Sequence, residues 1–442
     1  MFKVKRYIPA LLSLALAGCA VPAIVQRNEN KSVPPSYDDR TDTTRMLTVQ
    51  WRSFFTDPNL VALIDTALNN NQELKITLQE IQIANNDILY RQGPLLPRVV
   101  ARLGAGVEKV GRYTSQGAGD ATTEIRPGEE VPDPLMDYTA AAYANWEIDI
   151  WKKLHNAKKA AINRYLSTVE GRNFVLTNLI AEVAASYYEL LALDNQLEIV
   201  RQNIRLQENA LAVIKTQKEA ARVTELAVQK FQAEVLNSQS LEFDFIQRIK
   251  ETENRINFLL ARYPQPIPRD KNAFLTLVPS LVNAGVPSQL LANRPDIKQA
   301  EMDLAAAKLD VKVARAEFYP SLEITGAVGF QAFKPTYLVR FPESLLYSLA
   351  GDLAGPLINR KAIKAEFYNA NARQLQAMYN YERSILNAYL EVSTQLSKID
   401  NLERSYDLKS KEVDALTRSI EISNTLFTSA RADYREVLMT QR

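Results

Sequence analysis

The sequence predicts a mainly α-helical fold with a membrane β-barrel part, and three observations support this prediction. Similar segments recur 223 residues apart, which indicates two structural repeats. Several short segments alternate strictly between apolar and polar residues, as strands of a membrane barrel do. Two long stretches, 172–263 and 357–442, contain neither glycine nor proline, the residues that most often interrupt helices. Together these features predict long helices joined to a small number of membrane strands.

The repeat is clearest where a helix passes into a strand. Asn70–Lys75 and Asn293–Lys298 each open a helical run that has an aspartate at the matching mid-helix position, Asp87 or Asp310, and ends at a proline, Pro97 or Pro320. Each proline is followed by an apolar residue at every second position. These alternating sets are Val99, Ala101, Leu103, Ala105 and Val107, and Leu322, Ile324, Gly326, Val328 and Phe330. Strands are therefore expected at about 98–110 and 321–333, after helices at about 72–92 and 293–317.

Each of these strands is expected to pair with a second one and form a hairpin. The partner strands fall at about 137–148 and 343–354, which gives hairpins over 98–148 and 321–354. Their apolar sets are Ala140, Ala142, Ala144, Trp146 and Ile148, and Leu345, Tyr347, Leu349 and Leu353. One apolar and one mostly polar face is the pattern of a barrel wall between lipid and water.

The helical lengths indicate an elongated body. The helix expected at 152–221 would be about 105 Å long, its returning partner at 225–262 about 57 Å, and the helical column at 60–92 about 50 Å. One long helix therefore matches two short ones stacked end to end. Apolar residues at alternating spacings of three and four, from Leu190 onward, predict coiled-coil packing of the hairpin 152–262.

The first residues have the pattern of a processing segment. Lys3, Lys5 and Arg6 precede a short apolar run, and 1–18 is interpreted as a signal peptide. The sequence Leu16-Ala17-Gly18-Cys19 resembles the bacterial lipobox, so Cys19, the only cysteine, is the predicted lipidation site. An ordinary secretory peptide with an incidental cysteine is the alternative. Residues 19–50 are expected to form a lipidated, extended tether.

The remaining divisions follow from the repeat. Repeat one covers 51–265, a proline-rich linker covers 266–292, and repeat two covers 293–442 with a long helix at 357–430. The turn expected after the helix 357–430 aligns with the turn expected after the helix 152–221 at an offset of 209 residues. The Asp433–Glu436 segment resembles a capping box that opens a return helix. By this offset the return helix would end near residue 471, so a truncated product or fragment is expected.

The residues argue against several kinds of chemistry. A formal charge of +2 over 442 residues does not suggest a nucleic-acid partner. His155 is the only histidine, which disfavours histidine metal sites and catalytic triads, and no cofactor is expected. Glu147 and Asp149 could form a carboxylate pair of the glycosidase kind, but a structural role at a strand-to-helix junction is the preferred interpretation.

Several segments are similar to those of the TolC-type outer membrane factor family, the channels of tripartite efflux pumps, and in particular to its lipoprotein branch. The matching segments are 51–58, 91–97, 146–151, 286–297 and 314–322. The segment with Arg294-Pro295-Asp296 and Phe318-Tyr319-Pro320 is the most diagnostic.

The resemblance implies a homotrimer in the outer membrane of a Gram-negative bacterium. Four strands from each of three protomers would form a shared 12-strand barrel, and the helices a periplasmic α-barrel. The protein would then be a passive, non-enzymatic export duct for drugs or other small molecules, with an inner-membrane pump and a periplasmic adaptor as partners. Four strands alone would leave unpaired edges in lipid, so the residues agree with the implied trimer.

The sequence departs from the family at the expected periplasmic entrance. Ala221 and Ala430 occupy turn positions where the family usually has glycine, and Met439 occupies an acidic position. Residues near the two turns are the candidates for a gate or adaptor contact: Arg222, Thr224, Glu225, Arg431, Asp433, Tyr434 and Glu436. The alternative is that they are simple helix caps and solvated charges.

Two other functions were weighed against an export duct. A periplasmic adaptor lipoprotein would have one helical hairpin, whereas this sequence predicts two hairpins and two amphipathic strand pairs. A lipoprotein hydrolase would need a nucleophile motif, and the single histidine argues against it.

Overall fold

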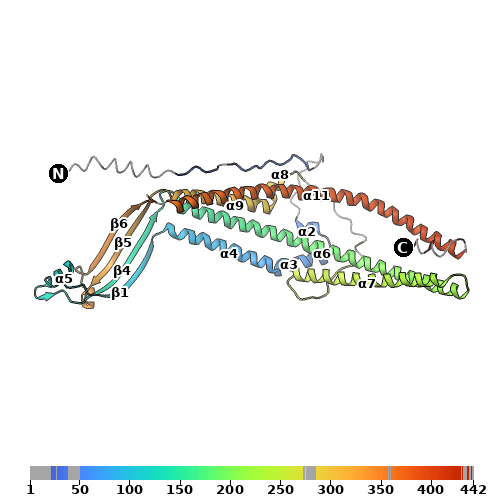
Figure 1. Cartoon of the computed structure of the whole chain (residues 1–442), viewed down its shortest axis with the longest axis horizontal. Helices are drawn as coiled ribbons and strands as arrows, with labels where there is room; N and C mark the ends of the chain where they lie inside the picture. Colours follow the sequence, from blue (N-terminus) through green and yellow to red (C-terminus); the bar gives the residue numbers. More distant parts are fainter. Residues whose placement is uncertain are drawn as a thin grey trace. The chain divides into compact units, whose positions relative to one another are not determined.

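The computed structural model describes residues 21–25, 27–37, 50–271, 274, 285–356, 358, 360–429, 431, 436–437 and 440 (Figure 1). The predicted signal peptide and Cys19 lie outside the described residues. The chain divides into two compact units. The first comprises 1–30, 80–169 and 299–382, and the second comprises 31–79, 170–298 and 383–442. Both predicted repeats contribute to each unit, and the division of the sequence into repeats and linker stays a prediction.

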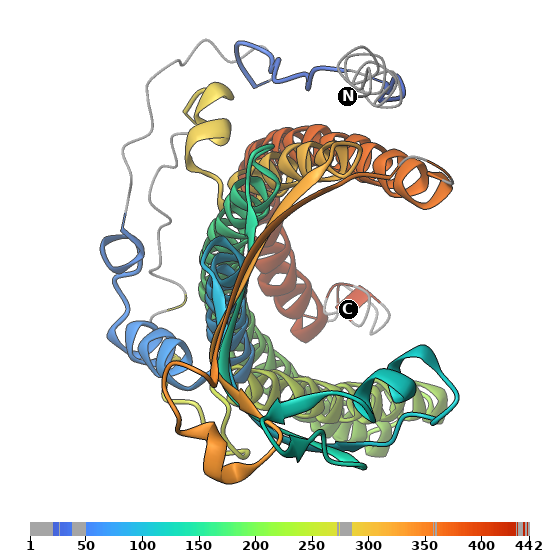
Figure 2. The same cartoon turned by 90° about the vertical axis from the view of Figure 1, so that its left-hand side faces the viewer.

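The first unit contains a four-stranded antiparallel sheet in the order β1-β4-β5-β6. The strands span Arg98–Glu108 (β1), Leu135–Ile148 (β4), Ser321–Ala332 (β5) and Leu345–Ala354 (β6). All four lie where alternation predicts them, although each differs from the predicted bounds by one or two residues at one end. The sheet is curved (Figure 2). The prediction of four strands per chain is confirmed.

Helices join the sheet at one end. α4 (Gln72–Gln92) and the short turn η2 (Gly93–Leu95) lead into β1, and α9 (Pro295–Ala316) leads into β5. α6 (Lys153–Glu219) follows β4, and α11 (Lys361–Thr428) follows β6. Phe318 and Phe367 pack edge to face with ring centroids 5.5 Å apart in a cluster that also holds parts of α9 and α11. Aromatic burial therefore fixes the helices near their junction with the sheet.

The second unit has its core where α3 (Pro58–Asn70) and the end of α7 (Glu225–Leu259) pack against the middle of α6. α3 begins at Asp57, whose carboxylate accepts hydrogen bonds from the Asn59 backbone (2.8 Å) and the Tyr187 hydroxyl (2.6 Å). α7 returns beside α6, and the smaller helices α2 (Trp51–Phe54) and α8 (Ser288–Asn293) complete the helical elements of this unit. The predicted coiled-coil seam of α6 is confirmed, because six of its seven apolar members are buried and the seventh, Val200, is partly buried. The buried members are Leu190, Leu193, Leu197, Ile204, Leu211 and Ile214.

The two loops between paired strands contain small elements that the sequence analysis did not predict. They are α5 (Ser115–Asp120), β2 (Glu124–Arg126), β3 (Glu129–Glu130) and α10 (Pro335–Leu338). The Thr114 hydroxyl caps α5 by accepting a hydrogen bond from the Gly117 backbone (3.1 Å), and a Cβ at Gly117 would lie 2.3 Å from the Gly111 carbonyl oxygen. These elements depend on local capping and close backbone approach, which hydropathy patterns do not report.

The described part of the predicted tether is extended, but it also contacts the helices. Val21 and Ile24 pack against the Phe318–Phe367 cluster. Arg27 pairs with Glu382 at 3.2 Å, and Glu29 pairs with Lys308 at 2.9 Å. In the second unit, the Tyr37 ring is 2% exposed and stacks on Tyr389 at 5.3 Å. The composition of the tether predicts an extended chain but does not show which of its side chains contact the helices.

Candidate functional site

The sheet register places the apolar residues of all four strands on one face. Directly opposed pairs include Leu103 with Ala140, Ala142 with Val328, and Val328 with Tyr347. Residues directly opposite each other in adjacent strands project to the same side. Leu103 is 86% exposed and Leu349 82% exposed, so this face is not part of a core. The predicted alternating sets therefore form one continuous apolar surface, which is exposed on β1 and β6 and partly exposed on β4 and β5.

The other face of the sheet is mostly polar near the helices. Arg98 lies opposite Asn145, Glu147 opposite Glu323, and Glu323 opposite Asp352. The Asn145 amide donates a hydrogen bond to Glu323 at 2.5 Å. A sheet with one exposed apolar face and one polar face suits a wall between lipid and water.

Glu147 and Asp149 have structural partners at the junction between β4 and α6. The Lys153 ammonium lies 2.6 Å from Glu147. The Asp149 carboxylate accepts hydrogen bonds from the backbone of Leu154 (3.0 Å) and His155 (2.8 Å) and contacts the His155 ring nitrogen (2.5 Å). Burial raises the pKa of Asp149, but the hydrogen bonds from His155 and Leu154 outweigh burial, and this pKa stays below its ordinary value. The two carboxylates thus serve the junction, as preferred from the sequence.

Asp149→Ala is expected to destabilise the start of α6 by about 1 kcal/mol, because two backbone N–H groups of its first turn lose their acceptor. Thermal unfolding followed by circular dichroism measures this loss. Asp149→Asn is the matched control, since its single amide oxygen still accepts one of these two hydrogen bonds, and its loss should be smaller. The depressed pKa adds stability that is present above about pH 4 and is lost as the pH falls through the folded-state pKa. A pH dependence that is the same in both variants and the parent would contradict this assignment.

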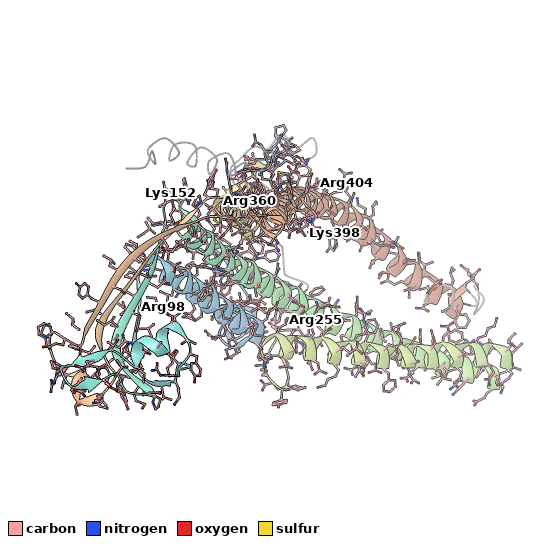
Figure 3. The ribbon with its side chains drawn as sticks, turned by 60° about the vertical axis from the view of Figure 1, so that its left-hand side comes forward. Arg98, Lys152, Arg255, Arg360, Lys398 and Arg404 are labelled. Carbon is pink, nitrogen blue, oxygen red and sulfur yellow. The ribbon has the colours of Figure 1, made fainter. Side chains whose placement is uncertain are left out.

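Aromatic and basic side chains also gather at the strand-to-helix junctions. The Trp151 ring stacks on Tyr319 with centroids 4.7 Å apart, and its indole nitrogen donates to the Pro320 carbonyl at 2.7 Å. Figure 3 labels Lys152 and Arg360 at the two junctions where strands pass into helices. Trp151 is 46% exposed. Exposed aromatic and basic residues at the end of an apolar face are typical of a membrane interface.

The turn between α6 and α7 contains three of the candidate entrance residues. Ala221, two residues after the end of α6, has φ 55°, and two backbone hydrogen bonds close the turn, from Ala221 to Lys218 (2.8 Å) and from Arg222 to Gln217 (2.9 Å). This pattern is a Schellman motif, whose left-handed position usually holds glycine. Ala221 occupies that position here at a conformational cost.

Ala221→Gly is expected to stabilise this turn by about 1 kcal/mol, because glycine adopts a positive φ without the steric cost of a Cβ. The midpoint of thermal unfolding measures the change. Ala227→Gly, a buried helical position in α7, is the control and should destabilise instead. A lower unfolding midpoint for Ala221→Gly would show that the positive φ of Ala221 does not reduce the stability of the protein.

The side chains after this turn are held by local charges. Thr224 occupies the N-cap position of α7 with extended backbone, although among the described residues its side chain makes no capping hydrogen bond. Glu225 accepts a hydrogen bond from Gln229 at 2.7 Å and pairs with Lys218. These two contacts, Gln229 first, lower the pKa of Glu225 below its ordinary value. Arg222 and Thr224 are exposed.

The second turn is described only in part. Arg431 and Glu436 are exposed, and the Arg431 backbone donates to Leu426 at 2.9 Å, the same five-residue closure that Arg222 makes. Asp433, Tyr434, Ala430 and Met439 lie outside the described residues. Phe427, near the end of α11, packs with Val223 against the buried cluster that joins α6 and α7. The structure therefore brings the end of α11 to the α6–α7 turn within the second unit.

The sequence matches the family model described as outer membrane efflux protein over residues 63–262 and 286–442. The chain belongs to this family. It is 30% identical to the pyoverdine export outer membrane protein OpmQ of Pseudomonas aeruginosa over 89% of this chain and 81% of that protein. It is 25% identical to the cation efflux system protein CusC of Escherichia coli over 99% and 92%, respectively.

A solved structure shows the same fold. The open-state outer membrane channel MtrE of Neisseria gonorrhoeae superposes with a TM-score of 0.80 at 21% identity, over 95% of this chain and 91% of that chain. Membership in the family identifies the protein as an outer membrane channel component of tripartite efflux systems, without enzymatic activity. The adaptor and hydrolase alternatives are therefore set aside.

Sequence reasoning missed a buried ionic cluster in the second unit. The Arg269 guanidinium contacts Asp194 through two nitrogens and lies 2.8 Å from Glu253 and 3.0 Å from the Ile267 carbonyl. The Arg269 and Asp194 side chains are 8% and 2% exposed. The sequence does show an aspartate, Asp194, next to the apolar seam of α6, which indicates a buried charge with a partner. The sequence does not show that this partner is Arg269.

Proposed function

We propose that three copies of this efflux channel close a common barrel of 12 strands in the outer membrane and form one export duct. The observation that carries the proposal is the sheet itself, whose apolar face is exposed along the edge strands β1 and β6 and partly exposed along β4 and β5. Among the described residues, β1 and β6 form the two edges of the sheet. Unpaired backbone groups cost several kcal/mol each in the hydrocarbon region, so a membrane sheet must close. Joining β6 of each copy to β1 of the next satisfies both edges.

Exposed apolar rows on the helices support the same assembly. On α4, Ile76, Ile83 and Tyr90 recur every seven residues and are 60%, 67% and 72% exposed. On α11, Ile399, Val413 and Leu416 recur at coiled-coil spacing and are exposed, although a coiled-coil seam normally lies against a neighbouring helix. A second copy would supply the missing neighbours.

We propose further that Cys19 carries a lipid anchor. Val21 and Ile24, two and five residues after Cys19, pack against the cluster next to the strand-to-helix junction. A lipid on Cys19 would therefore lie near the membrane interface that Trp151 and Tyr319 indicate. Globomycin, which inhibits lipoprotein signal peptidase, should leave the unprocessed form of the parent, and Cys19→Ser should prevent acylation measured by mass spectrometry.

The helical turns are proposed to form the periplasmic entrance that meets an adaptor and an inner-membrane pump. Arg222, Thr224, Glu225, Arg431, Asp433, Tyr434 and Glu436 remain the candidates for a gate or adaptor contact. The described members are exposed and lie at helix ends. One relative is named for pyoverdine export and another for cation efflux, so we assign the choice of substrate to the pump rather than to the channel. In the described part of the chain, no group of three metal-ligating side chains occurs.

Light scattering of the full chain in detergent tests the assembly. The expected protein mass is three times that of one processed chain, and the trimer should conduct ions across a planar lipid bilayer. A chain that stays monomeric in detergent and in membrane extracts, under conditions where it is folded by circular dichroism, would contradict the proposal.

A further inference from the structure

The contact between β4 and β5 within one chain provides a template for the contact between two chains. We propose that β6 of one copy pairs antiparallel with β1 of the next copy, with Ala354 directly opposite Arg102. In this register the numbers of any two opposed residues add up to 456. We propose that the same interface pairs Arg373 of one copy with Asp87 of the next. This inference rests on the trimer proposed above and specifies how its copies join.

The sheet relates the two halves of the chain by two constant offsets. β1 and β5 begin at Arg98 and Ser321, which are 223 residues apart, as are Pro97 and Pro320. Arg98 lies opposite Asn145, and Ser321 lies opposite Ala354. β4 and β6 are therefore related by 209 residues. The helical turns have the same offset in sequence, since Ala221-Arg222 corresponds to Ala430-Arg431.

Applying these offsets to the β4–β5 pairing gives the register between copies. Asn145 lies opposite Thr325. The equivalent residues are Ala354 and Arg102. Along the same ladder Leu353 falls opposite Leu103, and Leu349 falls opposite Val107. All four of these leucine and valine residues belong to the exposed apolar face. A slip by one residue would turn one of the two apolar faces to the other side of the sheet, so the derived register preserves a continuous apolar surface.

The helices yield an ion pair through the same two offsets. The Arg164 guanidinium of α6 contacts the Asp310 carboxylate of α9 within one chain. The equivalent residues are Arg373 on α11 and Asp87 on α4, so both charges recur at the matching positions. Within one chain each has a local partner on its own helix, Glu366 at 3.2 Å from Arg373 and Arg91 at 3.5 Å from Asp87. Such exposed pairs are weak and can exchange for a pair between copies.

Burial differs between the two halves in the way that a missing neighbour would produce. Ala306 lies one helical turn before Asp310 and is 2% exposed, whereas its equivalent Ile83, one turn before Asp87, is 67% exposed. On α6, Ala160 and Ser167 flank Arg164 and are buried. Their equivalents on α11, Asn369 and Gln376, are exposed. The residues around Arg164 and Asp310, where α6 contacts α9, are thus buried, whereas the equivalent residues around Arg373 and Asp87 are exposed.

Engineered disulfides test the register in outer membranes. Residues directly opposite in an antiparallel pair have Cα atoms about 4.5–5.5 Å apart, within disulfide range, whereas a shift by two residues gives about 7–8 Å. Ala354→Cys with Arg102→Cys should convert most protein to covalent trimers on oxidation. Ala354→Cys with Val100→Cys is the displaced control and should remain mostly unlinked. Asn145→Cys with Thr325→Cys should link within one chain and verifies the oxidation conditions.

Charge exchange tests the ion pair. Asp87→Arg and Arg373→Asp should each raise the monomer fraction in detergent about two- to fivefold, and the double exchange should restore it. If light scattering shows trimers but the displaced pair links better than the predicted pair, the register is wrong while the trimer stands. If the double exchange fails to restore assembly, the ion pair is wrong. If the parent chain is monomeric, the proposed assembly itself fails.

Discussion

Replacing Arg269 by alanine is expected to destabilise the second unit by about 3–5 kcal/mol, because it leaves a buried carboxylate without its main partner. The Asp194 side chain is 2% exposed and accepts two hydrogen bonds from Arg269. Lys271 also lies 3.2 Å from Asp194, but its ammonium is largely exposed and compensates only in part. Arg269 further joins the linker to α7 through Glu253. The midpoint of thermal unfolding, followed by circular dichroism, measures this effect.

Arg255→Ala is the matched control for this substitution. Arg255 (Figure 3) pairs with Glu182 at 3.0 Å, but both side chains are about half exposed. An exposed pair of this kind contributes at most about 1 kcal/mol. Equal effects of Arg269→Ala and Arg255→Ala would contradict the assigned importance of burial. Pairing Arg269→Met with Asp194→Leu should recover much of the loss, since no buried charge remains on either partner.

Adding a single methyl group at Gly329 is expected to disrupt the centre of the sheet. A Cβ there would lie 2.4 Å from the Ala140 carbonyl oxygen and from Cα and Cβ of Ala141, so the backbones of β4 and β5 would have to separate. Overpacking of this severity costs about 3 kcal/mol or more. Gly329→Ala should therefore reduce the amount of folded protein in the outer membrane, measured by its resistance to urea in detergent.

Gly351→Ala provides the comparison for Gly329→Ala. Gly351 lies in β6 of the same sheet, and within the described structure an added Cβ there meets nothing within 4 Å. The two substitutions change the chain by the same methyl group. Equal urea resistance of both variants would show that β4 and β5 do not approach as closely as the structure has them.

The fold could be predicted largely from the sequence because its strongest determinants are periodic. Alternation located β5 from Leu322 to Phe330, and the observed register puts these residues on the same face as the apolar residues of the other strands. The spacing from Leu190 to Ile214 likewise identified a seam that is buried. Pro97 and Pro320 marked both passages from helix to strand. Periodicity reports which face is apolar, so it predicts elements and their orientation well.

The contacts that fix the elements could not be predicted in the same way. Asp194 and Arg269 are 75 residues apart, and neither lies in a motif that names the other. The close approach at Gly329 depends on the strand register, whereas the sequence shows only one more glycine in an alternating segment. At the entrance, the sequence located the α6–α7 turn. The role of Glu225 and the other entrance residues depends on partners outside this chain and stays a proposal.

Labelling of single cysteines along β5 in intact outer membranes tests the central claim most directly, namely that one face of the sheet meets lipid and the other meets water. The predicted result is a two-residue alternation with a membrane-impermeant maleimide. Thr325→Cys and Ala327→Cys should react, whereas Ile324→Cys and Val328→Cys should be protected. Uniform labelling, or labelling in the opposite phase, would contradict a sheet that separates lipid from a water-filled duct.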